Sequence, residues 1–311
     1  MMNLHRYGHA VIPGVVQVEE GAGGLPLLHV QNSFAECNIY VYGAHVVRFK
    51  PRERKDLLWL SPYSNFREGE PIRGGIPVIF PWFGKHRTRA DLPLHGFVRT
   101  RLWDIESTKC LPDGRTKIVF SVVDNESSRA IWLNRFRLEL SVIVGDALEM
   151  ALTIENREQK PFTCEDGFHT YFNVGNASQC EVGDFDGLEY IDRVKGDSRA
   201  IQQGPARFEN EMVHAFMHSP LVCELIDVAG QRRVQIEQLN MHSMVLWNPG
   251  EEAATKNPEI QDTWDQFVCI ESTNCLDCEL EIEPGRSHCS TLKLSEKKES
   301  GNEPENQSRA R

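Results

Sequence analysis

Hydrophobic and polar residues alternate with a period of two along much of this chain. Every second residue is apolar in Phe136–Val144 (FRLELSVIV), and Leu148–Glu155 (LEMALTIE) repeats the pattern. The residues VGDA join the two runs at a point where a tight turn fits. A period of two places successive side chains on opposite faces of a strand, so these segments are predicted to form a β-hairpin with one apolar face.

Further strands are predicted elsewhere. Cys278–Gly285 alternates strictly and ends in a Pro-Gly turn, after which Ser290–Leu294 is expected to return as its partner strand. Lys117–Asp124 and Arg232–Leu239 are also strand candidates, whereas Pro249–Glu259 is the stretch expected to form a short helix. Strands joined by turns, without βαβ alternation, indicate an all-β fold of large antiparallel sheets packed as a sandwich.

The distribution of residues along the chain bears on its domain organisation. The composition does not break before the last residues, so a single domain is predicted over residues 1–294. Residues 295–311 (SEKKESGNEPENQSRAR) are polar, charged and nearly free of apolar side chains. Such a segment cannot bury enough apolar surface to fold, and a disordered tail is predicted there.

The composition limits the classes of partner and compartment. Hydrophobic residues make up 40% and charged residues 25% of the chain, as in soluble globular proteins. No apolar run approaches the roughly 18 residues that cross a bilayer, and residues 1–14 lack the apolar core of a signal peptide. We therefore expect a cytoplasmic protein without a membrane partner. A formal net charge of −11 argues against nucleic acid, whose backbone requires an extended basic surface.

Nine cysteines are spread irregularly from Cys37 to Cys289. An odd number in a chain of this size indicates free thiols in a reducing compartment. Cys275 and Cys278 have metal-type spacing and His288 follows, but a zinc site usually needs two such pairs close together. We interpret them as incidental strand cysteines and expect no metal.

One segment reverses the acidic balance of the chain. Residues 72–104 hold one internal acid, Asp91, against a set of basic side chains: Arg73, Lys85, His86, Arg87, Arg89, His95, Arg99 and Arg101. A guanidinium held by a glycine-rich loop suits a phosphate, a carboxylate or a pair of sugar hydroxyls. The alternative is a solvated loop whose arginines pair with acids elsewhere in the protein.

Three other residues are candidates for a functional role. His169 lies between aromatic residues in EDGFHTYF, and if this segment is extended it shares one face with Tyr171. It is either a hydrogen-bonded core residue or a group that exchanges a proton near neutral pH. Trp247, beside an Asn-Pro-Gly turn, is either an ordinary packed residue or an apolar platform for a sugar ring. Glu271 ends the apolar run Phe267–Ile270, so it is expected to be ion-paired or catalytic.

Five blocks of sequence together resemble a known family. RGGIPVIFPWFG, LPLHGFVRTRLW, FHTYFNV, VLWNPG and VCIES are similar to successive signatures of the glucose-6-phosphate 1-epimerases. These are the hexose-6-phosphate mutarotases of the galactose-mutarotase-like, or aldose 1-epimerase, superfamily. The blocks occur in the family's order from about residue 25 to residue 294, which is nearly the whole chain.

The resemblance implies an antiparallel β-supersandwich that interconverts the α and β anomers of a hexose 6-phosphate without a cofactor. It places the catalytic residues at His169 and Glu271 and the substrate-binding residues at Arg73, His95 and Arg99. Ring opening and reclosure need one acid and one base, which an imidazole and a carboxylate supply. We expect a monomer.

Two positions depart from the family pattern. Many members have a glutamine where this chain has Leu94, and members usually have a substrate-binding aspartate where it has Val213. Losing a hydrogen bond to a sugar hydroxyl typically costs about 1 kcal/mol, or more with a charged acceptor.

Weakened affinity, a shifted hexose preference and replacement by nearby Glu209 or Glu211 are the alternatives left open. The loss also keeps a sugar-phosphate-binding protein without turnover as an alternative, and an epimerase of unphosphorylated aldoses is a further one. A retaining glycosidase would pair Glu165 or Asp166 with Glu271, but no motif supports it.

Overall fold

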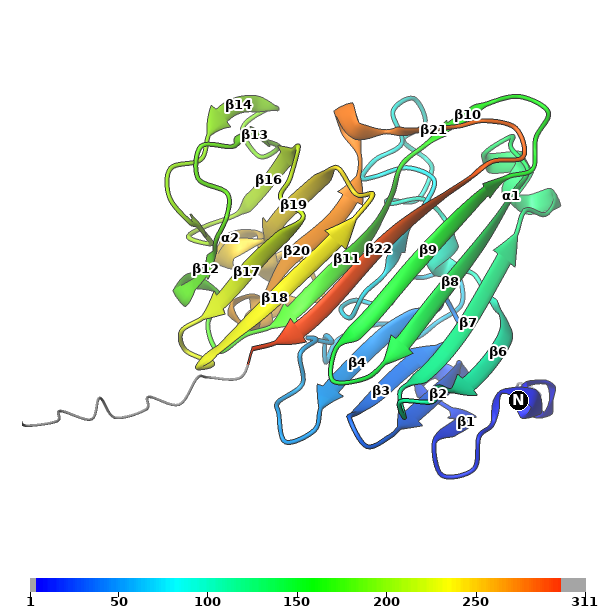
Figure 1. Cartoon of the computed structure of the whole chain (residues 1–311). Coiled ribbons are helices and arrows are strands. Elements are labelled where there is room, and N and C mark those ends of the chain that lie inside the picture. Colours follow the sequence, from blue (N-terminus) through cyan, green and yellow to red (C-terminus); the bar gives the residue numbers. More distant parts are fainter. Residues whose placement is uncertain (1–3, 298–311) are drawn as a thin grey trace, which may run out of the picture.

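Antiparallel β-sheets make up most of the protein (Figure 1). The computed structural model describes residues 4–297. The largest sheet has nine strands, in the spatial order β15 (Ala206–Arg207), β12 (Cys180–Val182), β17 (Val222–Asp227), β18 (Arg232–Leu239), β22 (Ser287–Glu296), β9 (Leu148–Asn156), β8 (Phe136–Val144), β7 (Thr116–Val123) and β6 (Asp104–Cys110). A second sheet has seven strands, in the order β14 (Ser198–Ile201), β13 (Glu189–Asp192), β16 (Met212–Met217), β19 (Ser243–Asn248), β20 (Phe267–Asn274), β11 (Asp166–Asn173) and β5 (Val78–Ile79).

Two small sheets and a few short helices complete the fold. The four-stranded sheet contains β1 (Val16–Glu20), β2 (Pro26–Gln31), β3 (Ala35–Tyr40) and β4 (His45–Pro51), and a two-stranded sheet pairs β10 (Phe162–Cys164) with β21 (Leu280–Ile282). The α-helices are α1 (Glu126–Ile131) and α2 (Gly250–Thr255), and the 3-10 helices are η1 (Leu4–Ala10), η2 (Ala22–Gly24), η3 (Val98–Thr100), η4 (Ala177–Gln179), η5 (Gln261–Gln266) and η6 (Leu276–Cys278). The predicted all-β antiparallel fold is confirmed. No helix among residues 4–297 is long and apolar enough to cross a membrane.

The alternating segments form the strands predicted from them. Strands β8 and β9 pair along their whole length, and buried and half-buried residues alternate in both. Strand β18 covers the predicted Arg232–Leu239, β7 covers all but the last residue of Lys117–Asp124, and α2 lies within the predicted helical stretch. Helix α1 was not predicted from the sequence. Its six residues are too few for a helical period, although Asn125 and Ser128 cap it reciprocally.

One predicted pairing is wrong. Ser290–Leu294 does not return along Cys278–Gly285; it belongs to β22, which lies between β9 and β18 in the nine-stranded sheet. The shorter strand β21 pairs with β10 instead. The reason is that the ten-residue β22 finds two long neighbours in the large sheet, whereas β21 offers only three residues. Alternation predicts a strand and its faces, but not its neighbours.

The first residues of the predicted tail belong to a strand. Strand β22 includes Ser295 and Glu296, and Glu296 pairs with Val234 of β18. The strand therefore continues two residues past the predicted boundary at residue 294. Residues 298–311 of the predicted tail lie outside the described residues. The single domain, the monomeric state and the cytoplasmic location stay predictions.

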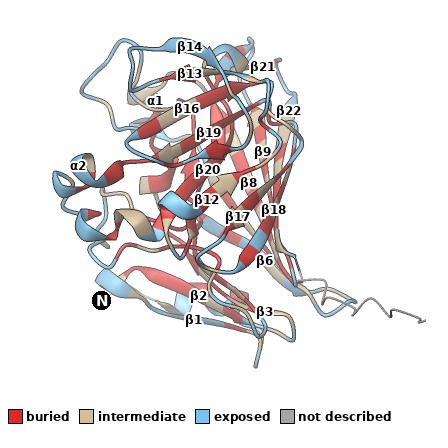
Figure 2. Ribbon diagram, turned by 90° about the vertical axis from the view of Figure 1, so that its left-hand side faces the viewer, coloured by how far each residue is buried: buried red, intermediate tan, exposed pale blue. Residues whose placement is uncertain are grey.

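The side chains of strand β11 point alternately into the main hydrophobic core and to the opposite face of the seven-stranded sheet. Phe168 and Phe172 point into the main hydrophobic core, which also contains the inner residues of β8 and β9. The alternate residues His169 and Tyr171 point to the other face, as the alternation predicted. Strands β19 and β20 are almost wholly buried, whereas β14 at the sheet edge is exposed (Figure 2). Polar side chains of β11 and β20 thus lie on a buried surface outside the core.

Candidate active site

His169 and Glu271 form the centre of the candidate site. They lie on the adjacent strands β11 and β20, where they are directly paired in register. Directly paired residues present their side chains on the same face of the sheet. The Nε2 atom of His169 lies 3.4 Å from Oε1 of Glu271, and the two residues are only 4% and 2% exposed. The sheet thus brings together the two residues predicted to be catalytic, although they are far apart in the chain.

The second polar atom of each side chain has no partner. Nδ1 of His169 and Oε2 of Glu271 are buried and make no hydrogen bond to the protein. Burial, opposed by the nearby Arg99, raises the pKa of the Glu271 carboxyl well above its usual range. Burial, reinforced by His95 and the site arginines, lowers the pKa of the His169 imidazole well below its usual range. Such paired groups, shifted by a dry environment, are typical of acid–base sites.

Aromatic rings hold the His169 imidazole in one plane. Tyr171 stacks on it with ring centroids 4.7 Å apart and an interplanar angle of 6°. Trp247 packs edge-on against both rings, at 5.7 Å from His169 and 5.9 Å from Tyr171. The structure therefore places Trp247 beside His169 and gives it contacts that orient the histidine. Its role as a platform for a sugar ring stays a prediction.

His95 approaches from a loop above the sheet. Its backbone adopts a positive φ of 60°, which turns the chain so that its ring lies 5.2 Å from the ring of His169. The backbone N–H of Gly84 donates to Nδ1 of His95, and the His95 N–H donates back to the Gly84 carbonyl. Burial, together with Arg99 and Arg73, lowers the pKa of this imidazole well below its usual range. His95 is therefore neutral, with its proton on Nε2.

Several cations of the basic segment have carboxylate partners. Arg87 pairs with Glu165 at 3.2 Å and with Glu279 at 2.8 Å. Arg89 pairs with Asp91 at 2.7 Å. For these arginines the alternative interpretation, ion pairing within an acidic protein, is the right one.

Arg73 is held from two sides next to the catalytic pair. Its Nη2 donates to a Glu259 carboxylate oxygen at 3.0 Å and its Nη1 donates to the Tyr171 hydroxyl at 3.1 Å. Both neighbours raise its pKa. Sequence reasoning missed Glu259, because nothing local in the chain marks a residue that contacts a loop 186 positions away. Tyr171 carried a signal, since its spacing of two from His169 puts it on the same face.

Arg99 differs from the other arginines of the segment. It lies in the short helix η3, is 7% exposed, and donates from Nη2 to the carbonyl of Leu94 at 2.8 Å. Within residues 4–297 it forms no ion pair with a carboxylate. Burial is the main cause that lowers its pKa to about 10. A buried cation that is not in direct contact with a carboxylate is unfavourable, so this geometry favours the binding of an anion.

Leu94 and Val213, the two departures from the family pattern, differ in how they reach the site. The Leu94 side chain is 47% exposed, and the residue reaches the site through its carbonyl, which accepts from Arg99. Val213 lies on β16 directly opposite Trp247, on the same face as the catalytic pair. An apolar residue therefore stands where the family comparison expects a carboxylate.

Glu165 and Asp166, the residues considered for a glycosidase, have structural partners. Glu165 accepts from the backbone N–H groups of Phe83 and Leu276, both at 2.7 Å. Asp166 accepts from the Asn274 amide at 2.8 Å. Glu165 in particular is saturated by loop contacts, so the glycosidase alternative gains no support. Residues 4–297 also contain no group of three or more His, Cys, Asp or Glu that could hold a metal ion.

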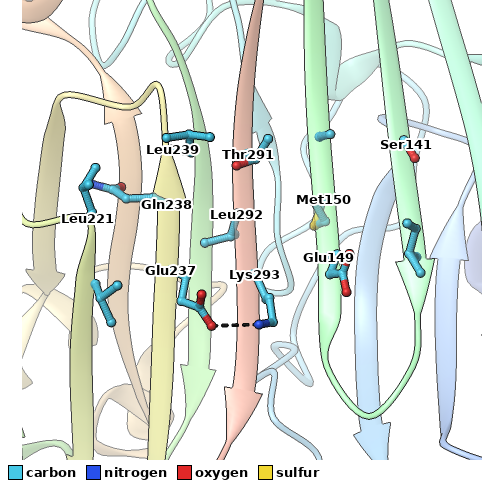
Figure 3. A pocket seen from close by; sticks show the side chains of 13 residues that line it. Ser141, Glu149, Met150, Leu221, Glu237, Gln238, Leu239, Thr291, Leu292 and Lys293 are labelled. Atoms are coloured by element: carbon cyan, nitrogen blue, oxygen red, sulfur yellow. Dashed lines mark hydrogen bonds and ion pairs between the residues drawn. The ribbon is translucent and has the colours of Figure 1, made fainter.

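A separate groove crosses the outer face of the nine-stranded sheet (Figure 3). It has a volume of about 370 Å³ and is lined by Ser141, Ile143, Glu149, Met150, Ala151, Leu221, Val222, Glu237, Gln238, Leu239, Thr291, Leu292 and Lys293. Lys293 pairs with Glu237 at 2.9 Å, as the dashed line shows, and Arg115 pairs with Glu149 at 2.7 Å. The groove has no histidine and its charges are matched, so it is not an acid–base site.

Comparison with known proteins agrees with this geometry. The sequence matches the aldose 1-epimerase family over residues 26–295. An Escherichia coli (strain K12) protein named "Putative glucose-6-phosphate 1-epimerase" is 30% identical over 251 residues, covering 80% of this chain and 83% of that protein. A protein of the same name from Cenchrus ciliaris is 28% identical over 291 residues, covering 90% of this chain and 87% of that protein.

The fold has a solved counterpart. A crystal structure of a "putative mutarotase" from Salmonella typhimurium superposes with a TM-score of 0.86 at 23% identity, covering 93% of this chain and 96% of that one. The resemblance inferred from the five sequence blocks is confirmed. The chain belongs to the aldose 1-epimerase family.

Proposed function

We propose that this protein interconverts the α and β anomers of a hexose 6-phosphate, with glucose 6-phosphate as the first substrate to test. One observation carries the proposal: a desolvated His169–Glu271 pair at 3.4 Å lies in the same site as Arg99, a buried guanidinium without a carboxylate partner. The pair supplies an acid and a base, and the cation supplies a place for a phosphate. The names of the relatives from Escherichia coli and Cenchrus ciliaris point to the same substrate.

The chemistry requires two proton transfers, one at O1 and one at O5, the two oxygen atoms bonded to C1. Glu271 accepts the proton of the O1 hydroxyl, and the electrons of that O–H bond form the C1=O1 double bond. The C1–O5 bond breaks, and O5 takes a proton from His169. Rotation about C1–C2 presents the other face of the aldehyde, and ring closure then returns each proton with the two roles exchanged.

The pair carries the right number of protons for this cycle. Burial favours a protonated Glu271 and a neutral His169, which together hold one proton more than a carboxylate beside a neutral imidazole. The same number of protons describes a carboxylate beside an imidazolium, so moving one proton converts the resting pair into the base and the acid. The site therefore needs no net proton exchange with solvent during turnover. The raised pKa of the carboxyl also makes it a stronger base once it is ionised.

The arginines are assigned different parts in binding. Arg99 is the principal partner of the 6-phosphate, because its charge is not neutralised in the free protein. Arg73 is already shared with Glu259 and Tyr171, so it contributes a fixed, partly compensated charge beside the same site. The polar end of the substrate is thereby anchored, and C1 and O5 are placed at the catalytic pair.

The test is anomer exchange in glucose 6-phosphate, measured by magnetisation-exchange NMR above the spontaneous rate in buffer. Wild type is expected to accelerate the exchange, and His169→Asn and Glu271→Gln are each expected to lower kcat at least 100-fold, the lower limit typical of a general acid or base. Glu237→Gln, in the outer groove, removes a charge far from the site and should retain full activity. Full activity in either catalytic variant would reject the assignment.

A second candidate follows from Val213. If this residue removes a contact that turnover requires, the protein binds sugar phosphate without catalysis. Calorimetry would then show saturable binding of glucose 6-phosphate while exchange stays at the buffer rate. The third candidate, an epimerase of unphosphorylated aldoses, predicts equal acceleration of glucose and glucose 6-phosphate, which the buried charge of Arg99 argues against.

A further inference from the structure

A loop of residues 82–96 carries His95 into the candidate site, and the tip of this loop is exposed to solvent. Residues 87–91 are all exposed, and they form neither a helix nor a strand. Two hydrogen bonds join His95 to Gly84 inside the loop, so the positions of these two residues are coupled. The placement of His95 therefore depends on what holds the chain next to Gly84.

Glu165 holds the loop at this point. Its Oε2 atom accepts a hydrogen bond from the backbone N–H of Phe83 at 2.7 Å. Phe83 directly precedes Gly84, and its ring lies edge-on to the His95 ring with centroids 4.9 Å apart. The Glu165 carboxylate thus fixes the loop through a residue that is linked to His95 along the chain and through ring packing.

The same carboxylate holds a second segment of the chain. Its Oε1 atom accepts from the backbone N–H of Leu276 in η6 at 2.7 Å and from Arg87 at 3.2 Å. The Leu276 backbone has a positive φ of 56°, a conformation that costs free energy for a residue with a side chain and persists only where contacts impose it. Leu276 and Phe83 also pack against one apolar cluster. One side chain therefore joins two segments that are far apart in the sequence.

The burial of Glu165 indicates an anchor and not a solvated surface group. The residue is 5% exposed, and both of its carboxylate oxygens accept hydrogen bonds. Hydrogen bonds to an ionised acceptor are stronger than those between neutral groups. The Arg87 side chain is 60% exposed and is shared with Glu279, so that ion pair adds little. The two backbone N–H groups therefore provide most of the anchoring.

We propose that Glu165 is a positioning residue for the substrate site, which it serves by fixing the loop that carries His95. The same loop supplies the Leu94 carbonyl that accepts from Arg99, so this contact depends on the loop as well. The inference rests on the proposed function, because its consequence is tighter binding of the substrate. The catalytic pair lies on β11 and β20 and is not carried by the loop, so the chemical step is independent of Glu165.

Glu165→Gln tests the proposal, because it keeps the size of the side chain but leaves one acceptor oxygen. The amide oxygen can serve Leu276 and Arg87, which share one oxygen in the wild type, and the NH2 group then faces the Phe83 N–H. Two donors repel each other, so the loop is released. An apparent dissociation constant is the intrinsic one divided by the binding-competent fraction, so KM for glucose 6-phosphate should rise at least fivefold while kcat changes less than twofold.

Glu279→Gln is the matched control, because it makes the same chemical change beside the same Arg87. It should leave KM and kcat, measured by magnetisation-exchange NMR, within about twofold of wild type. A merely structural role of Glu165 would instead reduce the folded fraction, which lowers the apparent kcat and leaves KM unchanged. An unchanged KM in Glu165→Gln, or an equal rise in Glu279→Gln, would overturn the inference while wild type stays active. A wild type that does not accelerate anomer exchange would reject the proposed function.

Hydrogen exchange of the wild-type protein tests the same coupling if Glu165→Gln does not fold. A substrate that binds only when the loop is anchored suppresses loop opening by one plus the ratio of its concentration to Kd. Glucose 6-phosphate at ten times the Kd from calorimetry should therefore slow exchange of the Phe83 amide about tenfold. The Gly114 amide, which bonds to the Leu111 carbonyl in the turn between β6 and β7, is the control and should not change. Equal exchange of the Phe83 amide with and without bound sugar phosphate would overturn the inference.

Discussion

Replacing Arg99 by methionine should weaken substrate binding and strengthen the fold. Methionine keeps an unbranched stem of similar length but removes the charge. In the free protein the Arg99 guanidinium is 7% exposed, and its hydrogen-bond partner is the Leu94 carbonyl. The wild-type residue therefore carries a buried charge that the substrate phosphate would neutralise.

The size of both effects follows from this environment. One tenfold change in a protonation equilibrium corresponds to about 1.4 kcal/mol. The lowering of the Arg99 pKa from 12.5 to about 10 thus means that the folded environment, chiefly through burial, disfavours the charged form by roughly 3 kcal/mol. Leaving the Leu94 carbonyl without its donor costs about 1 kcal/mol, so a net gain of about 1–2 kcal/mol in the free energy of unfolding is expected.

The loss of binding is expected to be larger. Removing one partner of a buried, hydrogen-bonded charge pair typically costs about 2–5 kcal/mol, which corresponds to at least about a 30-fold rise in KM. The effect on kcat should be small, since the phosphate is bound equally in the ground state and the transition state. The preference for glucose 6-phosphate over glucose should disappear.

Two measurements check the prediction: magnetisation-exchange NMR with both sugars, and urea denaturation in phosphate-free buffer. Arg101→Met is the control, because Arg101 belongs to the same segment but bonds to exposed Asn125 and Ser127. It should change KM less than twofold and stability by less than about 1 kcal/mol. An Arg99→Met protein that still prefers glucose 6-phosphate, or that is less stable than wild type, would refute the reasoning.

Two further predictions concern the carboxylates. The pKa of Glu271 is raised in the folded protein, so the folded protein keeps a proton that the unfolded chain releases near pH 4.5. The free energy of unfolding of the wild type therefore falls as the pH rises from 4.5 to the folded-state pKa. Glu271→Gln lacks this fall, so its melting temperature should exceed that of wild type at pH 8 by more than at pH 4; a constant difference would contradict the pKa argument. Glu259→Gln removes the carboxylate that competes with phosphate for Arg73, so KM for glucose 6-phosphate should fall about threefold while the fold loses about 1 kcal/mol. Glu251→Gln, an exposed change on α2, should alter neither quantity, and an increased KM in Glu259→Gln would show that Glu259 chiefly positions Arg73.

The alternation of apolar and polar residues predicted strand pairing correctly where the two strands are adjacent in the sequence. Alternation in Phe136–Val144 and Leu148–Glu155 predicted a hairpin, because sequence-adjacent strands joined by a tight turn have little choice of partner. It failed for Ser290–Leu294, whose neighbours in β9 and β18 come from distant parts of the chain. The face shared by His169 and Tyr171 was likewise predicted, since a period of two fixes faces within one strand.

The sequence of the basic segment does not show which of its arginines pair with carboxylates and which do not. Its cations looked alike along the chain, and both an anion site and a set of ion pairs were reasonable interpretations. The fold placed Arg87 and Arg89 beside carboxylates and buried Arg99 without one. Whether an arginine is neutralised depends on which acids lie within about 4 Å of it. The acid that pairs with Arg89 is two residues away, but those that pair with Arg87 come from distant parts of the chain.

The sequence by itself determined the strand-rich fold class and the family, because alternation and short motifs are local properties, and it named the candidate site residues that remain predictions. Only the tertiary structure decided that His169 and Glu271 meet in register, that Glu259 and Tyr171 hold Arg73, and that Val213 lies directly opposite Trp247. The physical reason is that burial and pairing determine the charge state of a side chain. Both depend on neighbours that strand order brings together across the sheet, and a pattern along the chain does not encode that order.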